Sequence, residues 1–131
     1  MPTPRELTAR FMQAYNQRDR EALRALLPPV LEYVRPGGGK LTTAEEVMAQ
    51  YERDWGVASS SSVEVRELVE SGDGIIAEIT IKGTIGGRSL VVEGVVIHRW
   101  RNGRLVRYRA YTDPLPAEAA AVQPPAGAGR V

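Results

Sequence analysis

The sequence contains no cysteine and only one histidine among its 131 residues. The absence of cysteine excludes disulfide bonds, thiolate zinc sites and cysteine nucleophiles. A metal site of the usual kind needs several histidine, cysteine or carboxylate ligands at regular spacings, and no such cluster is present. We therefore expect neither a metal ion nor a cofactor.

The chain also lacks a strong net charge and long apolar runs. Its formal net charge is +1, so no strong overall field attracts nucleic acid or a membrane surface. No apolar run approaches the roughly 18 residues that a membrane helix needs, and no apolar leader follows the first residue. The sequence predicts a soluble, cytoplasmic protein with no nucleic-acid or membrane partner.

Three helices are indicated by their start signals and by apolar residues at helical spacing. The segment 3–6 reads Thr-Pro-Arg-Glu, a capping box with proline at the first helical position. Asp19 is placed to cap a second, shorter helix that Pro28 ends. Thr42 or Thr43, followed by Glu45 and Glu46, predicts a third helix that extends to Trp55.

Short strands account for most of the remaining chain. A strand is predicted at 31–33, a loop at 36–39 and a linker at Ser59–Ser62. From Val63 apolar residues alternate with polar ones, which is typical of strands with one buried face. Tight turns are predicted at 86–87 and at Asn102-Gly103. Helices followed by an antiparallel meander indicate an α+β domain over 1–114, and we expect the Ala/Pro/Gly-rich tail, 115–131, to be disordered.

Four local signatures, in this order, resemble the nuclear-transport-factor-2-like superfamily and its SnoaL-like members. They are Tyr-Asn-Gln-Arg-Asp at 15–19, the strand, loop and helix over 31–55, Asn-Gly-Arg-Leu at 102–105 and Tyr-Thr-Asp at 111–113. The resemblance implies a cone-shaped, curved antiparallel sheet with three helices on its concave side. Because this fold carries isomerases, hydrolases, cyclases and binding proteins, it does not decide the function.

The catalytic residues of two such enzyme types have no counterparts here. Proteins that resemble ketosteroid isomerase need a tyrosine and two aspartates, and these places fall on Phe11, Arg35 and about Val96. Proteins that resemble limonene-epoxide hydrolase need an arginine and two aspartates, and these places fall on Ile79, Ile81 and Ala110. SnoaL-like cyclases use an aspartate near the last strand. Asp113 matches that signature, unless the cyclase acid aligns with Ala110.

The same resemblance and the alternation of the strands predict which residues face a pocket. The expected ligand-pocket residues are Phe11, Tyr15, Tyr33, Tyr51, Trp55, Ile79, Ile81, His98, Trp100, Tyr108 and Ala110. On the last strand, Val106 is also expected to face inward. His98, as the only group expected to titrate near neutral pH, and Asp113 are the candidate catalytic residues.

Three functions are consistent with these observations. The first is a binding domain that holds a small apolar or aromatic molecule. The second is a SnoaL-like isomerase or cyclase that moves protons on a carbonyl compound, with Tyr15, Tyr33 or Tyr108 as hydrogen-bond donor. The third is a protein-interaction module that uses the arginine-rich last hairpin. Val91, Val95 and Ile97 are expected to face outward and to support a homodimer through the sheet.

Overall fold

The helices begin at the residues that can satisfy their first free N–H groups. In the computed structural model, which describes residues 2–114, helix α1 (Pro4–Gln17) starts with a complete capping box. The Thr3 hydroxyl accepts from the Glu6 N–H, and the Glu6 carboxylate accepts from the Thr3 N–H. Thr43 and Glu46 cap α3 (Ala44–Val57) in the same way, and the Asp19 carboxylate caps α2 (Arg20–Leu26). The three predicted helices are confirmed.

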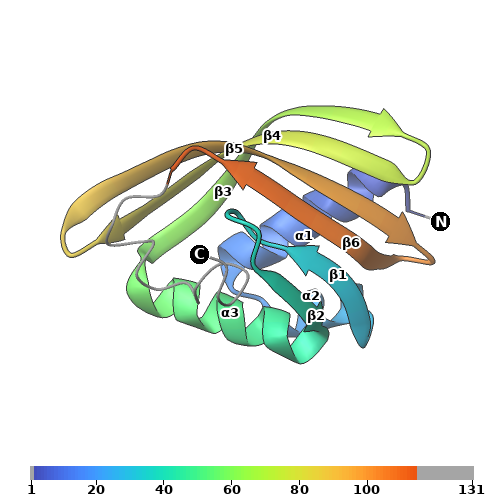
Figure 1. Cartoon of the computed structure of the whole chain (residues 1–131), viewed down its shortest axis with the longest axis horizontal. Helices are drawn as coiled ribbons and strands as arrows, with labels where there is room; N and C mark the ends of the chain where they lie inside the picture. Colours follow the sequence, from blue (N-terminus) through green and yellow to red (C-terminus); the bar gives the residue numbers. More distant parts are fainter. Residues whose placement is uncertain (1, 115–131) are drawn as a thin grey trace.

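A six-stranded sheet curves over these helices without closing into a barrel (Figure 1). The strand order is β2-β1-β6-β5-β4-β3. The strands are β1 (Val30–Val34), β2 (Lys40–Thr43), β3 (Ser59–Ser71), β4 (Gly74–Ile85), β5 (Arg88–Arg101) and β6 (Arg104–Thr112). The predicted α+β fold, with its helices on the concave side, is confirmed.

Three details of the strands differ from the prediction. The sheet is not wholly antiparallel, because β1 pairs with β6 in parallel while the other neighbouring pairs are antiparallel. The segment after the loop at 36–39 forms the short strand β2, which the sequence did not indicate. Ser59–Ser62 is not a linker but the first part of β3, although serine has no strong preference for strands. The tail predicted to be disordered, 115–131, lies outside the described residues.

Both predicted tight turns are present. Asn102 and Gly103 have φ angles of 51° and 76°, and Gly86 and Gly87 have φ angles of 57° and 78°. Two consecutive residues with positive φ match the right-handed twist of the strands that they join. These turns therefore fix the register of β4, β5 and β6, which form the wall of the cavity described below.

The core lies between the sheet and the helices. Leu23 of α2, Ile75 of β4 and Leu105 of β6 are almost completely buried in it, and each contributes roughly 1.5–3 kcal/mol by leaving water. None of the helices within the described part of the chain is long and apolar enough to span a membrane.

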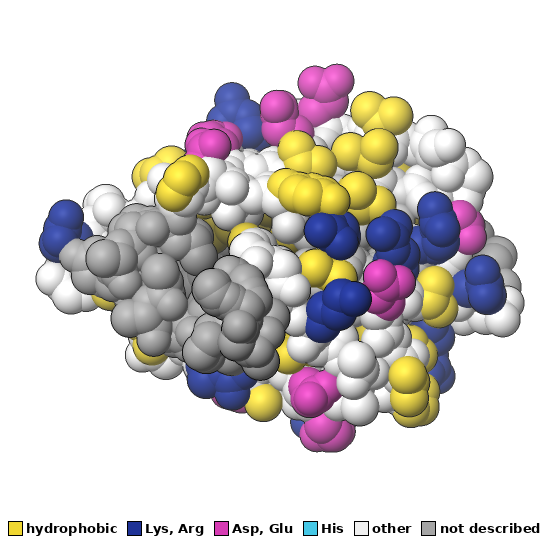
Figure 2. All heavy atoms as spheres, in the orientation of Figure 1, with side chains coloured by type: hydrophobic (Ala, Val, Ile, Leu, Met, Phe, Trp, Pro, Cys, Tyr) yellow, Lys and Arg dark blue, Asp and Glu magenta, His cyan; other side chains and the backbone are white. Residues whose placement is uncertain are grey.

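The opposite face of the sheet is mixed in character. Figure 2 shows hydrophobic side chains grouped over β5 and β6, with Lys and Arg side chains directly beside them. Val91 of β5 is 61% exposed, Tyr111 of β6 52% and Ile76 of β4 45%, whereas Val95 and Ile97 are only partly exposed. Most surface area of soluble proteins is apolar, but a group of large exposed side chains on one sheet face usually marks a contact site.

Candidate functional site

A cavity of about 150 Å³ lies between the concave side of the sheet and helices α1 and α3. Eight of the eleven predicted pocket residues line it: Phe11, Tyr15, Tyr33, Tyr51, Ile79, Ile81, Tyr108 and Ala110. Their part in binding a ligand stays a prediction. Because β4 alternates as expected and β6 does so from Arg107 onward, Ile79, Ile81 and Ala110 face inward as predicted.

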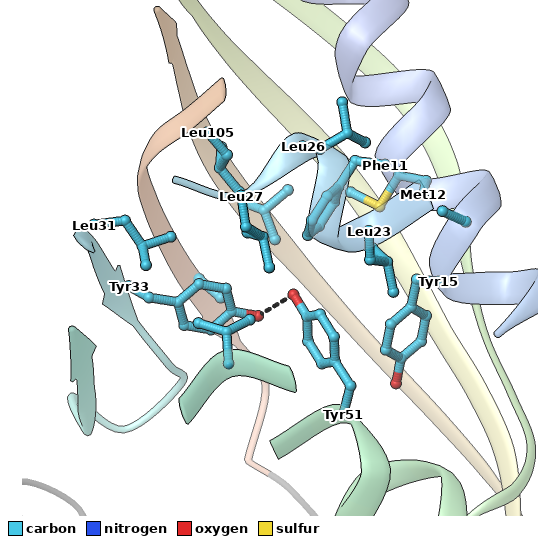
Figure 3. Packing of buried hydrophobic residues seen from close by; sticks show 14 of the residues in the cluster. Phe11, Met12, Tyr15, Leu23, Leu26, Leu27, Leu31, Tyr33, Tyr51 and Leu105 are labelled. Carbon is cyan, nitrogen blue, oxygen red and sulfur yellow. Dashed lines mark hydrogen bonds between the residues drawn. The ribbon is translucent and has the colours of Figure 1, made fainter. Parts of the chain in front are cut away.

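Three tyrosines from three different elements meet at one end of the cavity. The hydroxyl oxygens of Tyr33 and Tyr51 lie 2.7 Å apart and share a hydrogen bond, which Figure 3 shows as a dashed line. The Tyr33 ring also stacks on Tyr108, with ring centres 4.0 Å apart and an angle of 3° between the planes. This stacking follows from the parallel pairing of β1 and β6, which places Tyr33 beside Tyr108.

These hydroxyl groups stay protonated at physiological pH. Burial is the main cause that raises the pKa of Tyr108 to about 12 and the pKa values of Tyr33 and Tyr51 well above their ordinary value. In a shared bond between two neutral hydroxyls, only one proton is used. The cluster therefore keeps at least one proton that can be donated to an oxygen atom of a ligand.

Tyr15 adds a fourth hydroxyl on the α1 side of the cavity. Its oxygen lies 3.2 Å from the hydroxyl oxygen of Ser61 at the start of β3. Its ring meets Tyr51 edge to face, with centres 5.1 Å apart. Figure 3 shows Tyr15 and Tyr51 side by side, both reaching into the space between the helices and the sheet.

The cavity wall contains one carboxylate that the sequence did not indicate as a site residue. Asp54 of α3 lines the cavity, and its Oδ1 accepts a hydrogen bond of 2.9 Å from Gln50 Nε2. Arg53 Nη2 in turn donates to Gln50 Oε1 over 2.8 Å, which fixes the orientation of the amide. The helical spacing of Tyr51, Asp54 and Trp55 indicates that they share one face of α3, but it does not indicate that the carboxyl group is shielded from water.

Burial raises the pKa of Asp54 to about 6. The hydrogen bond from Gln50 and the positive charges of Arg35 and Arg53 act in the opposite direction, yet the pKa remains raised. The effect of burial is therefore larger than these three compensating effects together. Asp54 is the carboxyl group of the cavity wall that changes its charge close to neutral pH.

Arg35 brings a guanidinium group to the same wall. It follows β1, lines the cavity and is buried, and burial is the main cause that lowers its pKa. Its guanidinium lies in the space next to the Gly39 Cα, in the loop after β1.

The structure places His98 outside the cavity lining. Its side chain is 0% exposed, its Nδ1 lies 3.1 Å from the Thr8 hydroxyl oxygen, and the Phe11 ring meets it edge to face. Burial lowers the pKa of His98 to about 3, so the prediction that it titrates near neutral pH is wrong. His98 belongs to the inward face as predicted, but it lies in the filled core beneath α1.

Trp100 and Trp55 also lie outside the lining. Trp100 Nε1 donates to the Thr8 hydroxyl over 2.9 Å in the same part of the core as His98. Trp55 packs beside Tyr15, with the Arg20 guanidinium 5.0 Å above its ring centre. Strand and helix periodicity indicated which face these residues occupy, but not how deeply the neighbouring helix covers them.

Asp113 is exposed and does not line the cavity. Its backbone N–H donates to the Glu93 carbonyl over 2.9 Å, which ties the end of β6 to β5. The carboxyl group therefore has no contact with a molecule held in the cavity.

Within residues 2–114 no group of three or more His, Cys, Asp or Glu side chains is arranged to hold a metal ion.

The family model of the SnoaL-like domain matches residues 8–108. The chain belongs to this family. The comparison with curated proteins found no match.

Solved structures share the fold of this SnoaL-like domain. Wild-type IdmH from Streptomyces antibioticus, described as a candidate polyketide cyclase, is 22% identical with a TM-score of 0.79, over 86% of this chain and 93% of that one. An NTF2-like protein from Burkholderia thailandensis is 25% identical with a TM-score of 0.79, over 92% and 98%. A protein with a ketosteroid isomerase-like fold from Catenulispora acidiphila, in complex with trimethylamine, is 21% identical with a TM-score of 0.74, over 84% and 86%.

Proposed function

We propose that this SnoaL-like domain holds a small apolar or aromatic molecule in its cavity. The observation that carries the proposal is a space of about 150 Å³ lined by tyrosine rings and aliphatic side chains. An apolar cavity of about this volume accepts benzene in another protein. Apolar walls with a few polar groups are also the usual composition of small-molecule sites.

The proposal includes the absence of the isomerase and epoxide-hydrolase residue sets. The inward positions of Ile79, Ile81 and Ala110 support it, because none of these side chains can transfer a proton or stabilise a charge. The trimethylamine complex of the Catenulispora acidiphila protein supports the ligand-holding part of the proposal, since a protein of this fold binds a small molecule there. The cytoplasmic location stays a prediction from the sequence.

Filling the cavity tests the proposal. Ala110→Leu places extra carbon atoms inside, and Ala49→Leu is the matched control on the exposed side of α3. We expect native mass spectrometry to detect a released small molecule, or calorimetry to detect toluene binding, in the wild type and the control. The Ala110→Leu variant should lose this binding while melting cooperatively. Equal binding by both variants would contradict a ligand site in the cavity.

A second candidate function is acid–base catalysis on a carbonyl compound, as in isomerases and cyclases. Asp54 favours it, because a carboxyl group with a pKa of about 6 accepts and returns protons near neutral pH. The tyrosine cluster supplies a neutral donor for the carbonyl oxygen. The test is deuterium exchange into an enolisable ketone, followed by NMR. Exchange that is equally fast with Asp54→Asn would contradict this candidate.

We also propose a homodimer through the outer face of the sheet, the interaction function considered from the sequence. The exposed Val91, Ile76 and Tyr111 support it. Two arginines of the last hairpin are already engaged within the chain: Arg107 Nε lies 3.4 Å from Glu32 Oε1, and the Arg109 guanidinium lies over the Tyr111 ring. Light scattering should show a dimer for the wild type and a monomer for Val91→Glu. A monomeric wild type would contradict the dimer.

A further inference from the structure

The negative charge of the Asp54 carboxylate is only partly balanced by neighbouring groups, and the cavity wall around it consists largely of aromatic and aliphatic side chains. Charged and titratable groups face it from several elements: Arg35 after β1, Arg53 on α3, and the cavity tyrosines. The tyrosines are Tyr15, Tyr33, Tyr51 and Tyr108. All four tyrosines are neutral at pH 7, so only the two arginines oppose the negative charge.

The two arginines do not neutralise this charge completely. Arg53 directs Nη2 to the amide oxygen of Gln50, and the described hydrogen bond to the Asp54 carboxylate comes from the amide nitrogen of Gln50. Burial still outweighs both guanidinium groups and this hydrogen bond. Asp54 is only partly exposed, and a carboxylate in this situation is stabilised by a further cation or donor, since partial burial without full pairing costs free energy.

The surrounding rings favour a cation more than a neutral group. Tyr15 and Tyr51 meet edge to face and line the same cavity as Asp54, and tyrosine rings attract ammonium groups through their electron-rich faces. The rest of the cavity, formed by Ile79, Ile81 and Val96, is suited to an uncharged apolar body.

We infer that the cavity takes a small protonated amine, whose ammonium group pairs with the Asp54 carboxylate and whose apolar part lies against Ile79 and Ile81. This inference rests on the proposed ligand-holding function and names the chemical class of the ligand. Arg35 limits the choice, because a cation that fills the whole cavity would approach its guanidinium. The ligand therefore carries one positive charge at one end.

Three probes of nearly equal shape test the inference: benzylamine, benzyl alcohol and toluene. Their affinities for the wild type are measured by calorimetry at pH 7.5. We expect benzylamine to bind about tenfold or more tightly than benzyl alcohol, because hydrogen bonds between two charged groups are roughly twice as strong as neutral ones. Asp54→Asn should remove this preference, and toluene binding by this variant checks that its cavity stays open. Glu45→Gln, which removes an exposed carboxylate from the same helix, should retain the preference.

The dependence on pH provides a second readout. Benzylamine stays protonated through this range, whereas Asp54 loses its charge as the pH falls through about 6. The affinity of the wild type for benzylamine should therefore weaken by about tenfold per pH unit below that value, while the affinity for toluene stays constant.

The outcomes separate the inference from the proposed function. If benzyl alcohol binds as tightly as benzylamine, or if Asp54→Asn keeps the preference, the amine inference is wrong and the ligand-holding function stands. If none of the three probes binds to the wild type, the ligand-holding function fails for molecules of this size, and the inference fails with it.

Discussion

Replacing Thr8 by valine should destabilise the domain more than its change in shape suggests. The Thr8 side chain is 0% exposed on the inner face of α1. Its hydroxyl oxygen accepts a hydrogen bond of 2.9 Å from Trp100 Nε1 and shares one of 3.1 Å with His98 Nδ1. Valine fills the same volume but offers no polar atom, so both ring nitrogens lose their partner.

The magnitude follows from the number of groups left without a hydrogen bond. Each buried polar group without a partner costs about 1–3 kcal/mol, so Thr8→Val should lower the free energy of unfolding by about 2–6 kcal/mol. The other ring nitrogen of His98, Nε2, has no hydrogen-bond partner within residues 2–114. Without Thr8 the imidazole ring would therefore make no side-chain hydrogen bond at all. A total stability of about 5–15 kcal/mol is ordinary for a domain, so the loss is a large part of it.

Thr8→Ser is the matched control, because it keeps the hydroxyl and removes one methyl group. Its expected cost is about 1 kcal/mol. Urea unfolding followed by tryptophan fluorescence measures both variants, with equal m-values as the check on two-state behaviour. If valine costs no more than serine, the hydroxyl does not support His98 and Trp100, and the reasoning is refuted.

Three further predictions concern backbone packing and pH. Gly94→Ala should destabilise the domain by about 2 kcal/mol or more, because a Cβ there would lie 2.6 Å from the Tyr111 carbonyl oxygen; an unchanged melting temperature would contradict this. The NMR signals of the His98 ring protons should not shift between pH 5 and 8. The free energy of unfolding should fall as the pH drops from about 6.5 toward 3, because His98 binds a proton more tightly in the unfolded state than in the folded state. For Asp54 the sign is reversed: relative to Asp54→Asn, the wild type should lose stability as the pH rises from about 4 through 6. Urea unfolding of both proteins at each pH measures this. A difference in unfolding free energy between them that stays constant with pH would contradict the raised pKa.

Local signals in the sequence predicted most of the fold. Capping boxes and the Asn102-Gly103 turn depend on neighbouring residues only, so they could be predicted without knowledge of the rest of the fold. Strand β2 is too short to stand out by its own pattern and is stabilised by pairing with β1. The serines at the start of β3 carry little preference of their own and are stabilised by pairing with β4. The parallel pairing of β1 with β6 is a property of the whole sheet.

The start of β6 shows how one irregularity alters a prediction based on alternation. Val106 was expected to face inward, but the register shifts beside Trp100, which pairs with Leu105. Leu105 is fully buried and Val106 is only partly buried. A bulge inserts one extra residue, and every side chain beyond it changes face. The bulge depends on packing across the sheet, so alternation alone did not reveal it.

The candidate site was predicted as a set of positions but not as chemistry. The alternation of inward-facing and outward-facing residues identified Ile79, Ile81 and Tyr108, because they lie on regular strand segments. Alternation could not distinguish residues that line the cavity from residues in the filled core, such as His98, which α1 covers. Asp54 was missed because a single carboxyl group on a helix is usually solvated, and only the depth of the cavity shows that this one is not.

The parallel contact between β1 and β6 has a consequence for synthesis on the ribosome. The hairpin of β1 and β2 is made early, but its place in the sheet is beside the last strand. Until β6 has left the exit tunnel, Tyr33 has no stacking partner, and the N-terminal hairpin and α3 have an incomplete surface to pack on. The nascent chain therefore exposes these apolar faces until β6 has emerged, which is the period in which a chaperone would bind them.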